Sequence, residues 1–329
     1  MATTTTSDGP KLEALPFPEQ DKLGPIGSKV SVFDDDAELR RVLVAEFQGA
    51  ADAARDAAAS VDRNAANAVH DYRKALRRAR AILKLVAAAL PKSERRAVGR
   101  ALQEARRAVS TARDHAVAPE AVNMMSLGEV ERDTANAIIH ASNEAMPPIP
   151  EIKQLLAEGA ARTAAQVEAL EAALPQTIPW TVVEKGVRGV YAEARVSRKA
   201  AKNSKRSFHR WRRRSKELSY QLELLEDYAG LRVGEIQREI EGATDTQGPA
   251  VDLIMMRDFV KTHGGGVAKD ALDRLLDAIN SQVDDLMRDS RKAGREAFRR
   301  KPRRFARRVT KAVRRDLAPV APADDIHGD

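Results

Sequence analysis

The chain has 329 residues, with 56 Lys and Arg against 48 Asp and Glu, and a net charge of +8. It contains no Cys and 4% aromatic residues, which excludes a disulfide scaffold, a thiolate metal site and a Cys nucleophile. No apolar run approaches the ~18 residues of a membrane helix, and the N-terminus lacks a basic region followed by an apolar one. We therefore expect no membrane partner and no secretory signal.

The apolar spacing predicts an all-α fold of antiparallel helices joined by short loops. Residues 1–33 are rich in Thr, Pro and Gly and indicate a disordered arm, and 319–329 indicate a disordered tail. Between them, helices are predicted at 36–61, 64–90, 92–114, 120–145, 151–173, 180–202, 207–229, 230–242, 250–262 and 267–315, the last divided near Pro302. No segment alternates with the period of a strand.

Two of the predicted helices repeat one another. Residues 69–74 (VHDYRK) align with 208–213 (FHRWRR) at an offset of 139 residues. Each copy carries an apolar stripe that we expect in the core: Val69, Tyr72, Leu76, Ala79, Leu83 and Val86 in one, and Phe208, Trp211, Ser215, Leu218, Leu222 and Leu225 in the other. With the Pro cluster at 147–150, the repeat predicts a domain at 34–318 with helical halves at 34–146 and 151–318.

Positive charge is concentrated in three segments. Residues 69–86, 195–218 and 288–315 carry net charges of +5, +10 and +12, so the rest of the chain carries −19. This segregation favours a polyanionic partner, although solvated helix faces would give the same composition. Helical spacing strengthens the first interpretation, because a stripe of like charges destabilises an isolated helix.

The two repeated helices carry matching basic stripes. The first is formed by His70, Arg73, Arg77, Arg80 and Lys84, and the second by His209, Arg212, Arg213, Lys216 and Tyr220. The second stripe continues backwards through Lys202, Arg198 and Arg195 if the helix is unbroken, whereas a cap at Ser207 would start a new helix. The two matched His are either ligands of an anion or structural residues bonded to a backbone carbonyl.

These motifs resemble the CHAD domain, the conserved histidine α-helical domain. The resemblance is carried by H-x-x-R-x-x-x-R-R-x-R at 70–80, H-x-x-R-R-x-x-K-x-L-x-Y-x-L-E at 209–223, Arg113-Asp114, G-V-R-G-V-Y at 186–191 with Arg195, and K-P-R-R-F at 301–305 with Arg307 and Arg308. The sequence departs from the family pattern at Ser219, where Arg is usual, and at His115, where an apolar residue is common.

The resemblance implies two halves related by an internal pseudo-twofold repeat, with basic residues lining a shared groove or pore. It also implies binding of inorganic polyphosphate and a cytoplasmic location on polyphosphate granules, with other granule-associated proteins as further partners. We find no E-x-E-x-K motif of the CYTH triphosphatase domain, so that activity is not carried over. The expected protein is a stand-alone CHAD domain that is not an enzyme and uses no cofactor or metal.

The predicted polyphosphate-binding residues combine the two basic stripes with the other family motifs. They are His70, Arg73, Lys74, Arg77, Arg78, Arg80, Lys84, Arg113, Arg188, Arg195, Arg198, Lys202, His209, Arg212, Arg213, Lys216, Tyr220, Arg303, Arg304 and Arg307. Polyphosphate carries many charges and no bases, so Arg and Lys donors suit it, whereas single-stranded nucleic acid relies on aromatic stacking.

Two alternative functions remain open from the sequence. A nucleic-acid-binding helical protein would use the same basic surfaces, with 288–315 as its best support. A phosphate hydrolase would need clustered carboxylates and a metal. The acidic clusters at 34–36 and 284–285 are explained more simply by helix capping and solvated faces.

Overall fold

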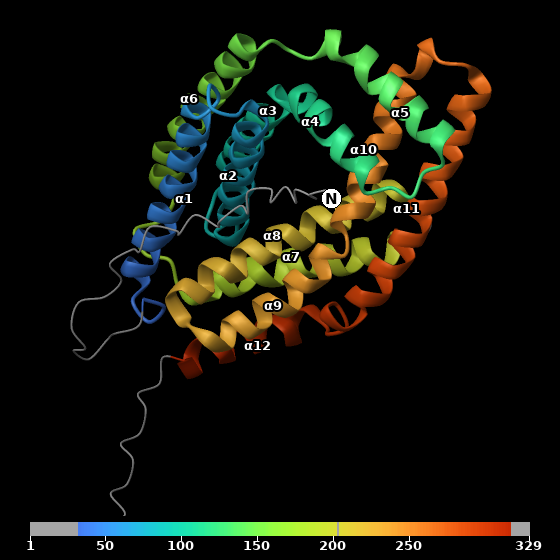
Figure 1. Ribbon diagram of the computed structural model, residues 1–329. Coiled ribbons are helices and arrows are strands. Elements are labelled where there is room, and N and C mark those ends of the chain that lie inside the picture. Colours follow the sequence, from blue (N-terminus) through green and yellow to red (C-terminus); the bar gives the residue numbers. More distant parts are fainter. Residues whose placement is uncertain (1–31, 203, 317–329) are drawn as a thin grey trace, which may run out of the picture. The chain divides into compact units, whose positions relative to one another are not determined.

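The computed structural model describes residues 32–202 and 204–316 (Figure 1). Within these residues every regular element is helical, which confirms the predicted all-α class. The α-helices are α1 (Asp36–Ala59), α2 (Ala65–Leu85), α3 (Lys92–Ala108), α4 (Ser110–Asn123), α5 (Glu129–Ser142), α6 (Ile149–Ala173), α7 (Trp180–Ala200), α8 (Lys205–Ala229), α9 (Leu231–Asp245), α10 (Gly248–His263), α11 (Lys269–Ala297) and α12 (Pro302–Asp316). The predicted disordered segments lie outside the described residues, except for residues 32 and 33.

The first set of helices is built around α1, which contacts α2 and α6, while α3 packs against α6. The side chain of Asp35 caps α1 by accepting hydrogen bonds from the backbone N–H groups of Ala37 and Glu38, at 2.9 and 3.0 Å. Phe33 was placed in the disordered arm, but its side chain is buried and meets the Trp180 ring edge-on, with centroids 5.2 Å apart. The packed core therefore begins earlier than the sequence predicted.

The second set packs α8 between α7 and α9, with α12 against α7 and α9. A Cβ atom at Gly186 would stand 2.3 Å from the carbonyl oxygen of Leu85, so the close approach of α7 to the end of α2 requires glycine. Tyr191 stacks on Phe305 of α12, with ring centroids 3.9 Å apart, and its hydroxyl donates to the carbonyl oxygen of Ala297 at 3.1 Å. The motif at 186–191 thus fixes α7 against α2 and α12.

The third set contains α4, α5, α10 and α11, in which α10 packs on α4 and α11, and α5 packs on α4 and α11. His115 of α4 is buried. Its two ring nitrogens each lie 3.0 Å from a backbone carbonyl oxygen, one of Thr111 and one of Ser142. The His that departs from the family pattern therefore joins α4 to the end of α5.

Two predicted helices have different bounds in the structure. The helix predicted at 92–114 is interrupted at Val109, and that predicted at 120–145 is replaced by the end of α4 and by α5. The loop between α4 and α5 is held by Gln282 of α11, which bonds the backbone N–H and C=O of Ser126 at 3.2 and 3.0 Å. This tertiary contact satisfies backbone groups that a continuous helix would have paired internally.

Packing crosses the predicted division at residues 146 and 151. The helix that follows the Pro cluster, α6, packs on α1 and α3, whereas α4 and α5 pack on α10 and α11. Figure 1 shows α6 beside α1, on the far side of the molecule from α5 and α11. The pseudo-twofold relation between the two halves stays a prediction.

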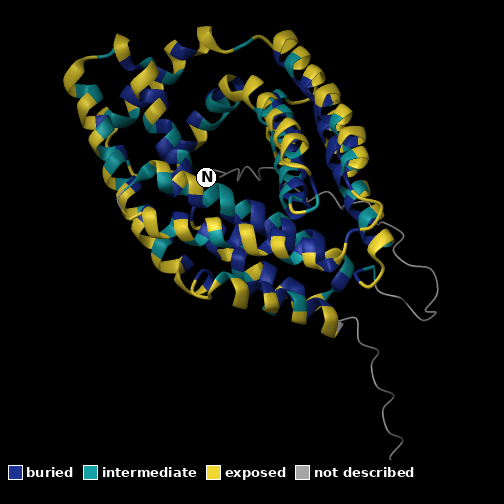
Figure 2. Cartoon of the chain, turned by 180° about the vertical axis from the view of Figure 1, so that it is seen from behind, coloured by how far each residue is buried: buried dark blue, intermediate teal, exposed yellow. Residues whose placement is uncertain are grey.

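The core follows the apolar stripes of the two repeated helices. All twelve residues predicted for these stripes are buried, and Figure 2 shows buried residues along the inner faces of the helices. Ser215, the polar member, lies 3.5 Å from the side-chain nitrogen of Gln247, so a buried hydrogen bond takes the place of apolar contact. Among the described helices, none is long and apolar enough to cross a membrane.

Candidate anion-binding cavity

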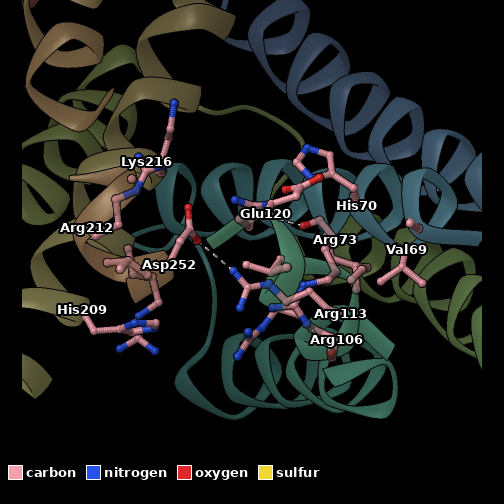
Figure 3. Close-up of a pocket in the computed structure, with 18 of the residues that line it drawn as sticks. Val69, His70, Arg73, Arg106, Arg113, Glu120, His209, Arg212, Lys216 and Asp252 are labelled. Atoms are coloured by element: carbon pink, nitrogen blue, oxygen red, sulfur yellow. Dashed lines mark hydrogen bonds and ion pairs between the residues drawn. The ribbon is translucent and has the colours of Figure 1, made fainter. Parts of the chain in front are cut away.

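A cavity of about 350 Å³ lies where the three helix sets meet. Helices α2 and α3 of the first set, α8 of the second, and α4 and α10 of the third contribute its walls (Figure 3). Its basic lining residues are His70, Arg73, Arg77, Arg80, Arg106, Arg113, His209, Arg212, Arg213 and Lys216, and its acidic lining residues are Glu120, Glu217 and Asp252. The structure thus brings both predicted basic stripes to one space, except for Lys84 and Tyr220 at their ends.

Packing of the apolar stripe sets the rotation of α2. Tyr72 is fully buried against α6, where a Cβ at Gly159 would stand within 3.0 Å of the Tyr72 ring. The residues that follow Tyr72 and Leu76 in sequence are then directed into the cavity. Arg73 donates to the carbonyl oxygen of Arg106 on α3 at 3.3 Å, and Arg77 donates to the Arg73 carbonyl at 3.1 Å. Both guanidinium groups are held by neutral backbone acceptors.

The same principle orients α8. Ser204 caps this helix by accepting from the backbone N–H of Ser207 at 3.1 Å, and Phe208 and Trp211 are fully buried in edge-to-face contact. The adjacent Arg212 and Arg213 line the cavity. Within the described chain, Nη1 of Arg212 and Nε of Arg213 are buried and have no hydrogen-bond partner. A bound anion would supply the missing acceptors.

The cavity concentrates positive charge that its three acidic lining residues compensate only in part. Burial, reinforced by the nearby charges of Arg113, Arg106 and Arg77, lowers the pKa of Arg73 to about 9. Burial is also the main cause that lowers the pKa values of the other basic lining residues with a clear shift, namely Arg106, Arg113, His209, Arg212, Arg213 and Lys216. Burial thus disfavours the cationic forms in the free protein, and a multivalent anion in the cavity would relieve this penalty.

One carboxylate lies between the two basic walls. Oδ1 of Asp252 on α10 is 3.6 Å from Nη2 of Arg113, and Figure 3 shows Asp252 between Arg113 and Arg212. Burial raises the pKa of Asp252, against the opposing influence of these two arginines. Glu120 is exposed at the cavity. Asp252 therefore occupies part of the space in which a ligand anion would meet Arg113.

The end of the α2 stripe meets a buried carboxylate instead of open space. Glu217 is 3% exposed and its carboxylate lies 3.0 Å from Arg80, 3.3 Å from Lys84 and 2.6 Å from Arg214. Lys84 also pairs with Glu193 of α7 at 2.9 Å. These contacts join α2, α7 and α8. We name Arg80, Lys84, Arg214 and Glu217 the Glu217 cluster.

The remaining predicted residues lie elsewhere. Lys74 and Arg78 are on α2 outside the cavity lining, with Arg78 paired to Glu223 at 3.5 Å, and Tyr220 lies one turn beyond Lys216. Arg188, Arg195 and Arg198 of α7 and Lys202, which follows α7, do not line the cavity, nor do Arg303, Arg304 and Arg307 of α12. The basic stripe of α8 does not continue backwards, because α7 ends at Ala200 and α8 starts anew at Lys205. The alternative of a new helix is confirmed, but the predicted cap at Ser207 is wrong, because Ser204 is the cap and Ser207 lies in the first turn.

Sequence reasoning missed Arg106, Asp252 and the role of Glu217. Arg106 lies on α3, which has no counterpart in the aligned repeat, and Asp252 lies in an otherwise apolar stretch of α10. Helical spacing could have identified Arg106, because Arg106 follows the buried Ala105 just as Arg73 follows Tyr72.

A second cavity of about 500 Å³ shares His209 and Arg213 with the first and is also lined by Lys205, Arg206, Arg210, Arg257 and Asp258.

Comparison with known proteins agrees with this architecture. No curated protein matches the chain. A crystal structure of the CHAD domain from the plant Ricinus communis superposes with a TM-score of 0.57 and 16% sequence identity, covering 84% of this chain and 96% of the plant chain. The family model of the CHAD domain matches residues 45–261, which is more than half of the chain and includes the five helices that form the cavity. The chain therefore belongs to the CHAD domain family.

Proposed function

We propose that the basic cavity binds inorganic polyphosphate. The observation that carries this proposal is the gathering of Arg73, Arg212 and Arg213 around one space without any ion pair to a described carboxylate. Half-buried cations without a carboxylate partner are costly in a free protein. Their cost is offset when an anion with several charges occupies the space.

The chemistry of the lining suits a chain of phosphates. Arginine guanidinium groups present paired donors to phosphate oxygens, and Lys216 adds an ammonium group. The cavity contains no Phe, Tyr or Trp on which a nucleobase could stack. The second cavity shares His209 and Arg213, so a chain longer than the first cavity would meet further cations from Lys205 onward.

The proposed role is binding and not catalysis. The protein would associate with polyphosphate granules in the cytoplasm through this cavity, and granule-associated proteins would be its neighbours there. The family to which the chain belongs supports a binding role for the cavity. Incubation with polyphosphate and Mg²⁺ or Mn²⁺ should release no phosphate; measurable release would overturn this part of the proposal.

The site is tested by comparing two double variants in titration calorimetry with long-chain polyphosphate. Arg73→Ala with Arg212→Ala removes two cavity cations, and we expect at least about 150-fold weaker binding, since each lost charged hydrogen bond contributes roughly 1.5–3 kcal/mol. Lys74→Ala with Arg188→Ala removes the same charge from exposed positions outside the cavity. This control should bind within about twofold of wild type, because exposed charges are screened by salt.

The length of the ligand provides the second arm of the experiment. Polyphosphates of graded length, ATP and duplex DNA are titrated at equal phosphate concentration. We expect affinity to rise with polyphosphate length and to exceed that for ATP. Equal loss of affinity in both double variants, or ATP binding as tight as a long chain, would contradict the proposed site.

A further inference from the structure

A second strongly basic surface lies on α12, away from the cavity. Residues 299–315 contain ten Lys and Arg and no Asp or Glu. α12 packs against α7, α8 and α9, and Figure 1 shows it at the edge of the molecule, on the other side of α8 from α2 and α4. It also lies beyond residues 45–261, which match the family model. This surface therefore needs an explanation of its own.

The exposed cations of α12 form one row. At 100° per residue, the six positions fall within about 120° of the helix surface and extend for roughly 18 Å along its axis. We name this row the α12 face: Arg303, Arg304, Arg307, Lys311, Arg314 and Arg315. None of these six forms an ion pair with a described residue, whereas Arg308, which points to the side, pairs with Glu239 of α9.

The opposite side of α12 is anchored firmly in the core. Phe305, Val309 and Val313 are buried, and Thr310 accepts a hydrogen bond from the Trp180 indole N–H at 3.0 Å. The stacking of Phe305 on Tyr191 adds a further contact. The cations of the α12 face are therefore presented on a rigid support, and little backbone ordering would be needed for them to engage a partner.

From this geometry we infer that the α12 face binds the phosphate backbone of duplex DNA without reading its sequence. A duplex offers a stiff array of phosphates, with one negative charge per ≈ 1.7 Å of axis, to a stiff row of cations. The α12 face has no aromatic residue, so it lacks the stacking platform used for single strands. The apolar side of α12 is buried, so it cannot insert into a lipid surface as a free amphipathic helix does.

A flexible polyphosphate chain fits this face less well than it fits the cavity. On an open helix face the chain would lose conformational freedom in return for contacts on one side only. The cavity instead surrounds its occupant with cations from α2, α4 and α8. The cavity therefore suits a flexible polyanion and the α12 face a rigid one. Duplex binding at the α12 face does not depend on the function proposed for the cavity.

The test compares two triple variants of the full chain by fluorescence anisotropy with a labelled 30-base-pair duplex. The first, Arg303→Gln, Arg307→Gln and Arg314→Gln, removes three charges from the α12 face. The control, Arg96→Gln, Arg100→Gln and Arg107→Gln, removes three exposed charges from α3 and has the same net charge. Circular dichroism checks that both variants keep their helicity.

We expect the first variant to bind the duplex at least tenfold more weakly at 0.1 M salt, with the slope of log affinity against log salt reduced by about 3. The α3 control should change affinity by less than about twofold. The Arg73→Ala, Arg212→Ala variant should keep duplex binding, and the α12 variant should lose no more polyphosphate affinity than the α3 control, so that the two proposals fail separately.

Three outcomes would overturn the inference. One is duplex affinity of the α12 variant equal to that of wild type. Another is an equal loss of duplex binding in the α3 control, which would assign the effect to net charge. The third is tighter binding, per charge, to vesicles with anionic lipid or to single-stranded DNA than to the duplex.

Discussion

The two ends of the basic stripe on α2 have opposite environments. Arg73 and Arg77 face the cavity, where their side-chain hydrogen bonds go to backbone carbonyls and their charged neighbours are mostly other arginines. Arg80 and Lys84, one and two turns further on, contact the buried carboxylate of Glu217. One sequence pattern thus supplies both a candidate binding surface and a structural ion-pair cluster.

The difference shows what decides the role of a buried cation. A stripe at i, i+4, i+7 and i+11 states only that the side chains share a helix face. Where a carboxylate from a second helix pairs with such a cation, the ion pair links the two helices. Where no carboxylate is in contact, the positive charge is available to a ligand. Substitutions in the Glu217 cluster and in the cavity test this difference.

The largest effect is expected from Glu217→Gln. This change leaves Arg80, Lys84 and Arg214 without their shared carboxylate, and removing one partner of a buried ion pair typically costs about 3–5 kcal/mol. Urea denaturation should show this decrease in the free energy of unfolding. Glu193→Gln, whose carboxylate is about half exposed, is the matched control and should cost less than about 1 kcal/mol.

The same cluster sets the acid sensitivity of the fold. Although burial opposes ionisation, Lys84, Arg214 and Arg80 lower the pKa of Glu217 below the usual 4.5. Because the folded pKa is the lower one, the contribution of Glu217 to stability is full above pH about 4.5 and is lost as pH falls through the folded value. Equal stability of wild type and Glu217→Gln at pH 7 would contradict the role given to this cluster.

Neutralising an arginine in the cavity should instead increase the free energy of unfolding. Arg73→Gln removes a charge whose pKa is lowered to about 9 by burial and neighbouring arginines, so we expect the free protein to gain roughly 1–2 kcal/mol of unfolding free energy. Thermal unfolding without polyanion measures this gain. Saturating polyphosphate should then raise the melting temperature of wild type more than that of the variant. Loss of stability in Arg73→Gln would show that Arg73 is a structural brace as well.

Removing the charge of Asp252, which lies between the two basic walls, should strengthen polyphosphate binding. Asp252→Asn keeps the shape of the side chain, leaves Arg113 with Asp114 at 3.3 Å as its remaining carboxylate partner, and removes a charge that repels phosphate. We expect about fivefold tighter polyphosphate binding by titration calorimetry at pH 7. Asp273→Asn, at an exposed carboxylate on α11 outside both cavities, serves as the control and should have less than twofold effect. Weaker binding after Asp252→Asn would mean that Asp252 positions Arg113 for the ligand.

The sequence predicted the fold well where local pattern determines it. The apolar stripes through Tyr72 and Trp211 and the break at Pro302 are all in place. The pattern did not reveal which helices pack together, because α6 follows the Pro cluster in sequence and yet lies against α1. Such pairings depend on the shapes of whole helix faces that meet only in the folded chain.

The site was predicted in part for a related reason. Periodicity placed Arg73 and Arg212 on the correct faces, and the family resemblance added Arg113. It could not separate the cavity from the Glu217 cluster, because Glu217 pairs with residues about 137 positions away in sequence. Nor could it show that Arg195 and Arg198 lie on a different helix from Arg212, since that depends on the break between α7 and α8.

The smallest expected effect concerns the protonation of His209 in the cavity. Unlike the arginines beside it, this residue is positively charged only when its imidazole is protonated. Burial, with Arg213 and Arg113 nearby, lowers the pKa of His209 below 6.5, so this imidazole is neutral at pH 7 in the free protein. Phosphate beside it favours the protonated form, and binding should therefore take up a fraction of a proton and tighten about two- to threefold between pH 7.5 and 5.5.

Calorimetry in two buffers of different ionisation enthalpy measures the uptake, in an Asp252→Asn background so that this carboxylate does not titrate. His209→Asn should abolish the uptake, whereas His70→Asn, at an exposed position on the opposite wall, should leave most of it. Uptake that persists in His209→Asn would assign the proton to the polyphosphate itself and leave His209 with a purely structural role.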